Sequence, residues 1–196
     1  SDVFATGTLG ALDYVVRGMG ELPGRKSVML LSEGFKLFVK NVSGFSEQAR
    51  ILESLRRLTD QANRASVVIY TMDARGLQTL GLTAADDTGE LSSQQVEARL
   101  SDRKTELFDT QQGLTYLAQQ TGGFALINNN DLNGGVRRAL NDQNGYYLLG
   151  YAPTEETFDA KTRRFNKLSV KVRRPGLKIR YRSGFFGGSD EEIVKP

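Results

Sequence analysis

Two short apolar runs, each flanked by polar residues, constrain the fold of this chain more than any other feature. The first is Val28–Leu31, which is followed by a polar turn made of Ser32, Glu33 and Gly34. The second is the run SVVIYT at residues 66–71. Strands of this kind are typical of parallel sheets whose two faces are both covered by helices. In such sheets ligands bind at the carboxyl ends of the strands, so the turn at Glu33 marks the edge where a binding site is expected.

Helical patterns separate the two runs and continue after the second. Apolar side chains recur at helical spacing in residues 6–19, 46–64 and 110–120, and Asp131 caps a fourth helix that runs to about residue 140. A third strand is expected at residues 124–128. This alternation predicts an α/β fold with a doubly wound, mostly parallel sheet flanked by helices.

A long polar segment interrupts this alternation at residues 74–105, with a weak helical stretch near residues 92–100. Connections of this length are uncommon in compact domains and are usually functional or disordered. Two interpretations remain open, a mobile insertion and a partner-recognition loop, because loops at the carboxyl edge of a sheet carry specificity.

Strand signals replace helical ones after residue 143. A strand is predicted at Tyr146–Tyr151, and two stretches with a period of two flank Pro175–Gly176, which predicts an antiparallel hairpin. We therefore expect an α/β core over residues 1–143, a β-strand extension over residues 144–187 and a flexible tail over residues 188–196.

The predicted hairpin carries much of the positive charge. Ten of the 26 basic residues, and no acidic residue, lie between positions 161 and 182, which leaves 16 basic against 23 acidic residues elsewhere. In the hairpin Arg173 would face Lys178 and Lys171 would face Arg180, and such like-charged pairs are mildly destabilising unless solvent screens them. A solvated face is the interpretation we favour. The alternative is a polyanion site within residues 163–182 that binds through Lys171, Arg173, Lys178, Arg180 and Arg182.

Four classes of polyanion would suit such a site: an acidic protein, an anionic polysaccharide, lipid headgroups or nucleic acid. We rank nucleic acid last, because Phe165 and Tyr181 fall on the apolar side of the hairpin. No aromatic platform on which bases could stack therefore lies among the charges.

The chain contains no Cys and no His. Their absence excludes cysteine nucleophiles, Ser-His-Asp triads and ordinary zinc sites, so any bound metal would be a hard cation with oxygen ligands. Asp73, Asp86 and Asp87 offer carboxylates, but neighbours in a loop do not hold the fixed separation that acid–base catalysis requires. We therefore expect no enzymatic activity, and a carboxylate-dependent hydrolase ranks third among the alternatives.

Five segments resemble a known protein family: GRKSVMLLSEGF, ANRASVVIYTMDARGL, GLTYLAQQTGGFALINNNDLNGGVRRAL, NGYYLLGYAPT and KLSVKVRRPGLKIRYRSGFF. In this order they are similar to the later part of a von Willebrand factor type A (VWA) domain, in the bacterial branch that is common in acidobacteria and has extra C-terminal strands. The resemblance implies a Rossmann-type, doubly wound sheet. It also implies a protein-binding or cell-adhesion module, in which Mg²⁺ or Mn²⁺ lies at the carboxyl edge of the sheet.

The metal ligands of this family find only partial matches. The family uses an Asp-x-Ser-x-Ser motif, a Thr and an Asp, and the motif does not occur in this chain. By resemblance Thr6, or else Thr8, matches the Thr, and Glu33 replaces the Asp. Because near-octahedral Mg²⁺ tolerates misplaced ligands poorly, these residues do not complete a site. We favour a helix N-cap for Thr6 and a surface turn for Glu33; a shared ion would require both at one edge of the sheet.

The resemblance favours a non-enzymatic interaction module of an exported bacterial protein, either periplasmic, secreted or at the cell surface, with its targeting signal outside this chain. No apolar run reaches the length of a membrane span. The partner would be a protein or a surface polysaccharide, bound by Ser32, Glu33, Asp73, Asp86 and Asp87.

An open sheet edge is a further expectation. The family's first strand would lie beside Val28–Leu31, and no segment of this chain corresponds to it. Proteins avoid a hydrophobic edge of this kind. We therefore expect either an N-terminal portion outside this chain, or a second chain or swapped segment, to cover that edge.

Overall fold

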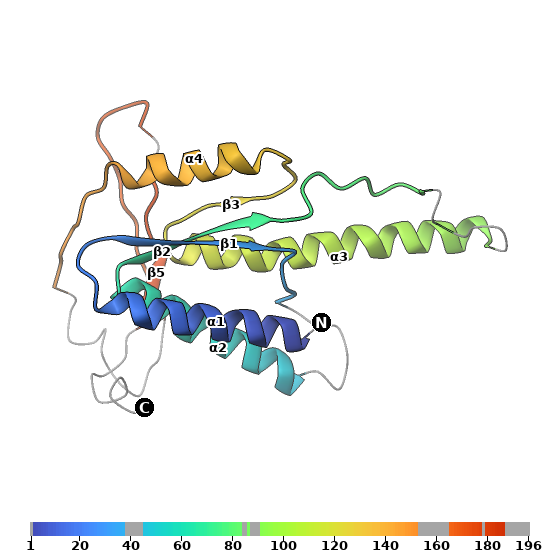
Figure 1. Cartoon of the computed structure of the whole chain (residues 1–196), viewed down its shortest axis with the longest axis horizontal. Coiled ribbons are helices and arrows are strands. Elements are labelled where there is room, and N and C mark those ends of the chain that lie inside the picture. The colour runs from blue at the N-terminus through green and yellow to red at the C-terminus, as the bar shows by residue number, and fades with distance from the viewer. Residues whose placement is uncertain are drawn as a thin grey trace.

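The computed structural model describes residues 2–37, 45–83, 86, 91–152, 165–177 and 179–186, and it has an α/β architecture (Figure 1). In this part of the chain three parallel strands form one sheet, in the order β1-β2-β3, and two antiparallel strands form a second sheet. The elements in chain order are α1 (Asp2–Gly20), β1 (Lys26–Ser32), α2 (Phe45–Arg64), β2 (Val67–Asp73), α3 (Ser93–Gln120), β3 (Ala125–Leu126), α4 (Leu132–Gln143), β4 (Phe165–Lys167) and β5 (Gly184–Phe186). The predicted α/β class, with a parallel sheet flanked by helices and antiparallel strands at the C-terminal end, is confirmed.

The central strand of the parallel sheet is β2, and every one of its residues is buried. It pairs with β1 along its whole length, from Lys26 opposite Val67 to Ser32 opposite Asp73, and with β3 at only two positions. The β-branched and aromatic residues of VVIYT suit a strand with neighbours on both sides and helices on both faces.

The two faces of the sheet are covered unequally. Side chains of α1, α2 and α3 share one apolar cluster with Val67 and Ile69, whereas Val68 and Tyr70 pack with Phe124 on the opposite face, under α4. Figure 1 shows α4 on one side of the sheet and α1 and α2 on the other. Burial of each large apolar side chain in these clusters contributes about 1.5–3 kcal/mol.

The helix α3 differs most from the sequence-based expectation. A loop and a separate short helix were predicted for residues 74–120, but residues 93–120 form one helix of 28 residues. Ser92 begins it with a capping box: its side chain accepts from the backbone N–H of Gln95, and the Gln95 side chain accepts from the N–H of Ser92. This reciprocal cap and a run of good helix formers outweigh the weak apolar periodicity.

Two further predictions about elements are wrong. The first helix begins at Asp2, so Thr6 lies inside α1 and is not an N-cap. Tyr146–Tyr151 is not a strand, and its large side chains are exposed. A strand forms only where a partner strand is available, and none pairs with this segment in the described part of the chain. The Asp131 cap of α4 is confirmed, since its carboxylate accepts from the N–H of Gly134 at 2.7 Å.

The C-terminal hairpin forms at its base. Phe165 pairs with Phe186 and Lys167 with Gly184, and the N–H of Leu168 donates to the carbonyl of Ser183 at 2.9 Å. Of the two strands predicted around Pro175–Gly176, only the start of the first forms within the described residues, and its partner is Gly184–Phe186, beyond the predicted second strand. Gly176 has φ +80°, as the second central residue of a type II turn requires.

None of the helices within the described ranges combines the length and the apolar character needed to cross a membrane. This finding accords with the absence of a long apolar run in the sequence.

Candidate functional site

A buried ion pair lies at the carboxyl end of β2. The Asp73 side chain has no exposed surface, and Arg75 binds it through two hydrogen bonds of 2.9 Å, from Nε to Oδ1 and from Nη2 to Oδ2. The backbone N–H of Arg75 also donates to Oδ1, at 3.1 Å. Gln111 of α3 donates to Oδ2 at 2.9 Å. Both carboxylate oxygens are therefore fully engaged by protein donors.

The same polar network joins three parts of the fold. Gln111 Nε2 also donates to Asn128 Oδ1, which follows β3, at 2.9 Å. Arg75 Nη2 donates to Thr110 Oγ1 of α3 at 3.0 Å. Burial raises the pKa of Asp73, but the hydrogen bonds from Arg75 and Gln111 outweigh it and lower the pKa below its ordinary value. Asp73 is therefore ionised at neutral pH and anchors its neighbours.

The turn after β1 packs closely against α3. Gly34 has φ +90°, and a Cβ at this position would collide with the carbonyl oxygen of Thr110. The N–H of Phe35 donates to that same oxygen at 3.3 Å, and the ring of Phe35 lies against Gly113. Ser32 Oγ accepts from the N–H of Gly34 at 3.1 Å. This packing leaves the Glu33 side chain exposed.

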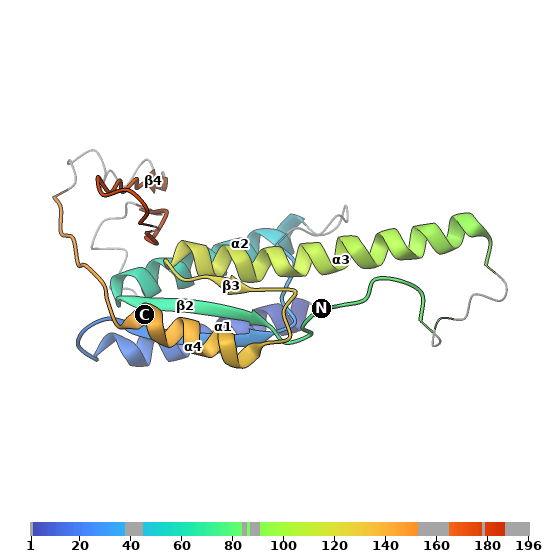
Figure 2. The same cartoon turned by 90° about the horizontal axis from the view of Figure 1, so that it is seen from above.

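An arm projects beyond the carboxyl edge of the sheet (Figures 1 and 2). We define it as the first part of α3, residues 93–109, together with the described residues that precede it, 77–83, 86 and 91–92. An ion pair between Asp86 and Arg103 joins its two sides, and the backbone N–H of Thr83 donates to Asp86 at 2.7 Å. These hydrogen bonds hold the pKa of Asp86 well below its usual range, Arg103 being the largest cause.

Large apolar side chains are exposed on the arm. Leu77 is 62% exposed, Leu82 is 51% exposed and Phe108 is 60% exposed. Only the second half of α3 is buried in the core; its buried residues begin at Gln111. The arm therefore presents apolar surface that the fold itself does not use.

The sequence suggested a metal site at Thr6 and Glu33. These two residues alone do not form a donor set suited to a divalent ion. Figure 1 places the start of α1 and the end of β1 at the same end of the sheet, as expected for Thr6 and Glu33, and both side chains are exposed. Asp73, the one buried carboxylate nearby, has its oxygens occupied by Arg75 and Gln111. Among the residues that the structure describes, no three acidic side chains gather as metal ligands would.

The predicted carboxylate residues lie in different places. Asp73 is buried at the sheet edge, and Asp86 lies on the arm beside Arg103. Arg103 and Thr110, which contacts the Asp73 network, are about 10 Å apart along the axis of α3. Asp87 falls outside the described residues. The two described carboxylates therefore do not act as one pair.

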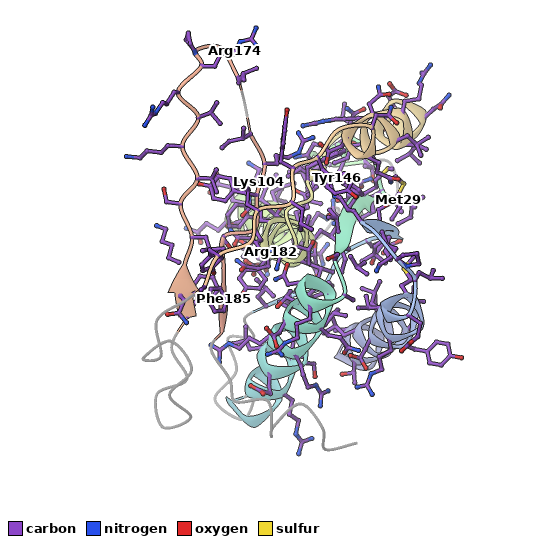
Figure 3. All side chains as sticks on the ribbon, turned by 90° about the vertical axis from the view of Figure 1, so that its left-hand side faces the viewer. Met29, Lys104, Tyr146, Arg174, Arg182 and Phe185 are labelled. Carbon is purple, nitrogen blue, oxygen red and sulfur yellow. The ribbon has the colours of Figure 1, made fainter. Side chains whose placement is uncertain are left out.

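The basic hairpin presents only part of its predicted charge to solvent. Lys171 and Arg173 are exposed, and Figure 3 shows the adjacent Arg174 at the tip. Arg180 is paired with Asp142 and lies over the Phe124 ring. Burial lowers the pKa of Arg182, against an opposing effect of Tyr151. Lys178 lies outside the described residues.

Sequence reasoning did not identify Arg75, Gln111 and Asn128 as members of the site. A local signal existed for Arg75, because it follows Asp73 by two residues and such pairs meet where a strand ends in a turn. Gln111 and Asn128 carried no such signal, since their contacts join segments that are distant in the sequence.

Comparisons of the chain with family models, with curated proteins and with solved structures find no match in any of the three.

Proposed function

We propose that this protein is a non-enzymatic, VWA-like interaction module of an exported bacterial protein, and that it binds a protein partner at the carboxyl edge of its sheet. The observation that carries the proposal is the exposed apolar surface of the arm, formed by Leu77, Leu82 and Phe108. Each of these side chains keeps at least half of its surface exposed and is therefore available as an apolar anchor for a partner. Ser32 and Glu33 lie at the same edge, and Asp86 lies on the arm.

The chemistry of the edge supports binding rather than catalysis. A general base needs a pKa near the working pH and access to its substrate. Asp73 has neither, because its pKa is lowered and its side chain is buried under Arg75. Its role in the proposal is to hold the arm and the sheet edge in a fixed arrangement for the partner.

The proposal requires no metal. The partner is held by apolar contacts on the arm and by polar groups at the rim, such as Glu33. Apolar anchors supply most of the affinity in protein interfaces of this kind, and exposed charges at the rim contribute less.

The test of the proposal compares Leu77→Asp and Phe108→Asp with Leu140→Asp. Leu140 is 55% exposed on α4, across the sheet from α1 and α2, so it is a matched control for an apolar-to-acidic change. A partner captured from bacterial envelope extract would be purified and its affinity measured by calorimetry. We expect each arm variant to raise Kd by about 30-fold or more, as for a hot-spot residue, and the control to stay within about twofold.

Equal affinity for all three variants would contradict the proposal. The measurement is made with Mg²⁺ and again with EDTA, because loss of binding in EDTA would show that a metal does mediate the contact.

One observation favours a second candidate function, polyanion binding by the hairpin. Lys171 and Arg173 are exposed near a turn that extends away from the sheet, with Arg174 at its tip (Figure 3). Like charges held close together on a narrow hairpin gain from a polyanion that neutralises them.

The test of this second function is retention on a heparin column over a salt gradient. The double variant Lys171→Glu/Arg173→Glu is expected to elute at clearly lower salt than the unmodified protein. The control Lys104→Glu/Arg137→Glu makes the same change in net charge at exposed positions on α3 and α4. If both variants elute together, net charge alone explains retention and the hairpin has no specific role.

A further inference from the structure

The chain contains two Asn-Gly sequences, Asn133–Gly134 and Asn144–Gly145. Asparagine is a thermolabile residue. Its side-chain amide is lost when the backbone nitrogen of the next residue attacks the side-chain carbon Cγ. Glycine in that next position hinders the attack least, because it has no Cβ. The two sequences therefore share the same local chemistry, and only the structure around them distinguishes them.

Both asparagines are accessible to solvent. Asn133 lies in the first turn of α4, Asn144 is the residue that caps the end of this helix, and both are exposed. Solvent access therefore does not separate the two sites. The difference lies in the backbone nitrogen of the glycine that follows each asparagine.

The backbone nitrogen of Gly134 is held in place by the cap of α4. Its N–H donates to Asp131 Oδ1 at 2.7 Å, and the N–H of Gly135 donates to the Asp131 carbonyl at 3.1 Å. A carboxylate that accepts from an N–H stabilises the protonated amide and disfavours the amide anion that attacks Cγ. The first turn must therefore open before the Gly134 nitrogen can reach Cγ of Asn133.

The backbone nitrogen of Gly145 has no such restraint. The N–H of Asn144 still donates to the Asn141 carbonyl, at 3.3 Å, but within the described part of the chain no group accepts from the N–H of Gly145. A Cβ at Gly145 would have open space around it. Residues 145–150 are exposed and lie outside helices and strands. No hydrogen bond of Gly145 therefore opposes the rotation that brings its nitrogen to Cγ of Asn144.

We propose that Asn144 is a deamidation site of this protein, and that the N-terminal cap of α4 protects Asn133 from the same reaction. The Gly145 nitrogen loses its proton and forms a bond to Cγ of Asn144. The bond from Cγ to Nδ2 breaks, and ammonia leaves with that proton. Water then opens the resulting five-membered succinimide ring at one of its two carbonyl carbons. One opening gives aspartate, and the other gives isoaspartate, in which the main chain runs through the side-chain carbon.

The reaction changes the connection between α4 and the C-terminal hairpin. It adds a negative charge at the C-terminal end of α4, where the helix dipole disfavours one. The new carboxylate lies two residues after Asp142, which already pairs with Arg25 and Arg180. Isoaspartate also lengthens the main chain by one atom just before the exposed residues Tyr146–Tyr151.

Peptide mass spectrometry of the folded chain, incubated at mildly alkaline pH, tests the proposal. Trypsin cleaves at Arg137 and Arg138, between the two sites, so each Asn-Gly sequence is read in a separate peptide. We expect the mass change from amide to acid at Asn144, at a rate at least about tenfold above that at Asn133, because the first turn of α4 must open locally. In urea, where the helix is lost, the two rates should become similar. Equal rates in the folded chain, or faster loss at Asn133, would overturn the proposal.

Two variants test the two halves of the proposal, with circular dichroism to show that each is folded. Gly145→Val keeps the attacking nitrogen but crowds it with a branched side chain, so we expect deamidation of Asn144 to slow by about tenfold or more. Asp131→Ala removes the cap and is expected to speed deamidation of Asn133 by about fivefold, while the rate at Asn144 stays the same. An unchanged rate at Asn144 in Gly145→Val would rule out attack by the Gly145 nitrogen. An unchanged rate at Asn133 in Asp131→Ala would rule out protection by the cap.

Discussion

Replacement of Asp73 by Ala is expected to lower the free energy of unfolding by about 3–5 kcal/mol, the range found when one partner of a buried ion pair is removed. The substitution removes the acceptor that the Arg75 guanidinium and the Gln111 amide share, and leaves them only Thr110 and Asn128 in a largely buried site. It also removes one of the hydrogen-bonded links between β2 and α3. The measurement is urea denaturation followed by circular dichroism, with the Asp73→Asn variant beside it.

Asp73→Asn is the matched control for the charge, because it keeps the shape and one acceptor oxygen. We expect it to be more stable than Asp73→Ala and less stable than the unmodified protein. If Asp73→Ala were as stable as the unmodified protein, the network would not anchor the edge as described.

The pH dependence of stability separates the charge of Asp73 from its packing. Its pKa in the folded state lies below the ordinary value of about 3.9. Its contribution to stability is therefore complete above that ordinary value and is lost as the pH falls through the lower folded pKa. Asp73→Asn lacks this component, so below about pH 4 its urea midpoint should fall less steeply than that of the unmodified protein.

Replacement of Gly34 by Ala is expected to lower the free energy of unfolding by about 2–5 kcal/mol, from backbone strain and steric overlap acting together. The φ of +90° disfavours any side chain, and the added Cβ would meet the backbone carbonyl of Thr110, which cannot move without displacing α3. Urea denaturation measures the loss.

Gly24→Ala separates strain from overlap. Gly24 has a similar φ of +78°, but a Cβ there has open space around it. The free energy of unfolding of Gly24→Ala should therefore fall only by the cost of backbone strain, about 1 kcal/mol. If both variants lost the same free energy, the close packing of the turn on α3 would not contribute to stability.

The parts of the fold with strong local signals could be predicted from the sequence. β2 and α2 were expected at nearly their observed bounds. A short, wholly apolar run predicts a buried strand, and a clear amphipathic stripe predicts a helix. The cap at Asp131 and the turn at Pro175–Gly176 also follow from local chemistry, and the structure shows the cap and a positive φ at Gly176.

The parts that depend on distant partners could not be predicted. α3 was divided because its first half has little apolar periodicity, although Ser92 and Gln95 formed a recognisable capping box. Tyr146–Tyr151 has high strand propensity and still forms no strand, since propensity acts only through pairing. For the candidate site, the sequence indicated the edge at Glu33 and Asp73, but not that Gln111 would occupy the Asp73 carboxylate.

The uninterrupted course of α3 has a mechanical consequence. One rigid helix of about 42 Å is buried in the core from Gln111 onward and carries the arm on its other half. A tilt of about 5° at Thr110 would displace the start of the helix by about 2 Å, because roughly 25 Å of helix extends beyond that point. Thr110 accepts a hydrogen bond from Arg75, so a movement of the arm also displaces the end of β2. A force applied to the first turn of α3 is therefore transmitted to the sheet through the helix itself.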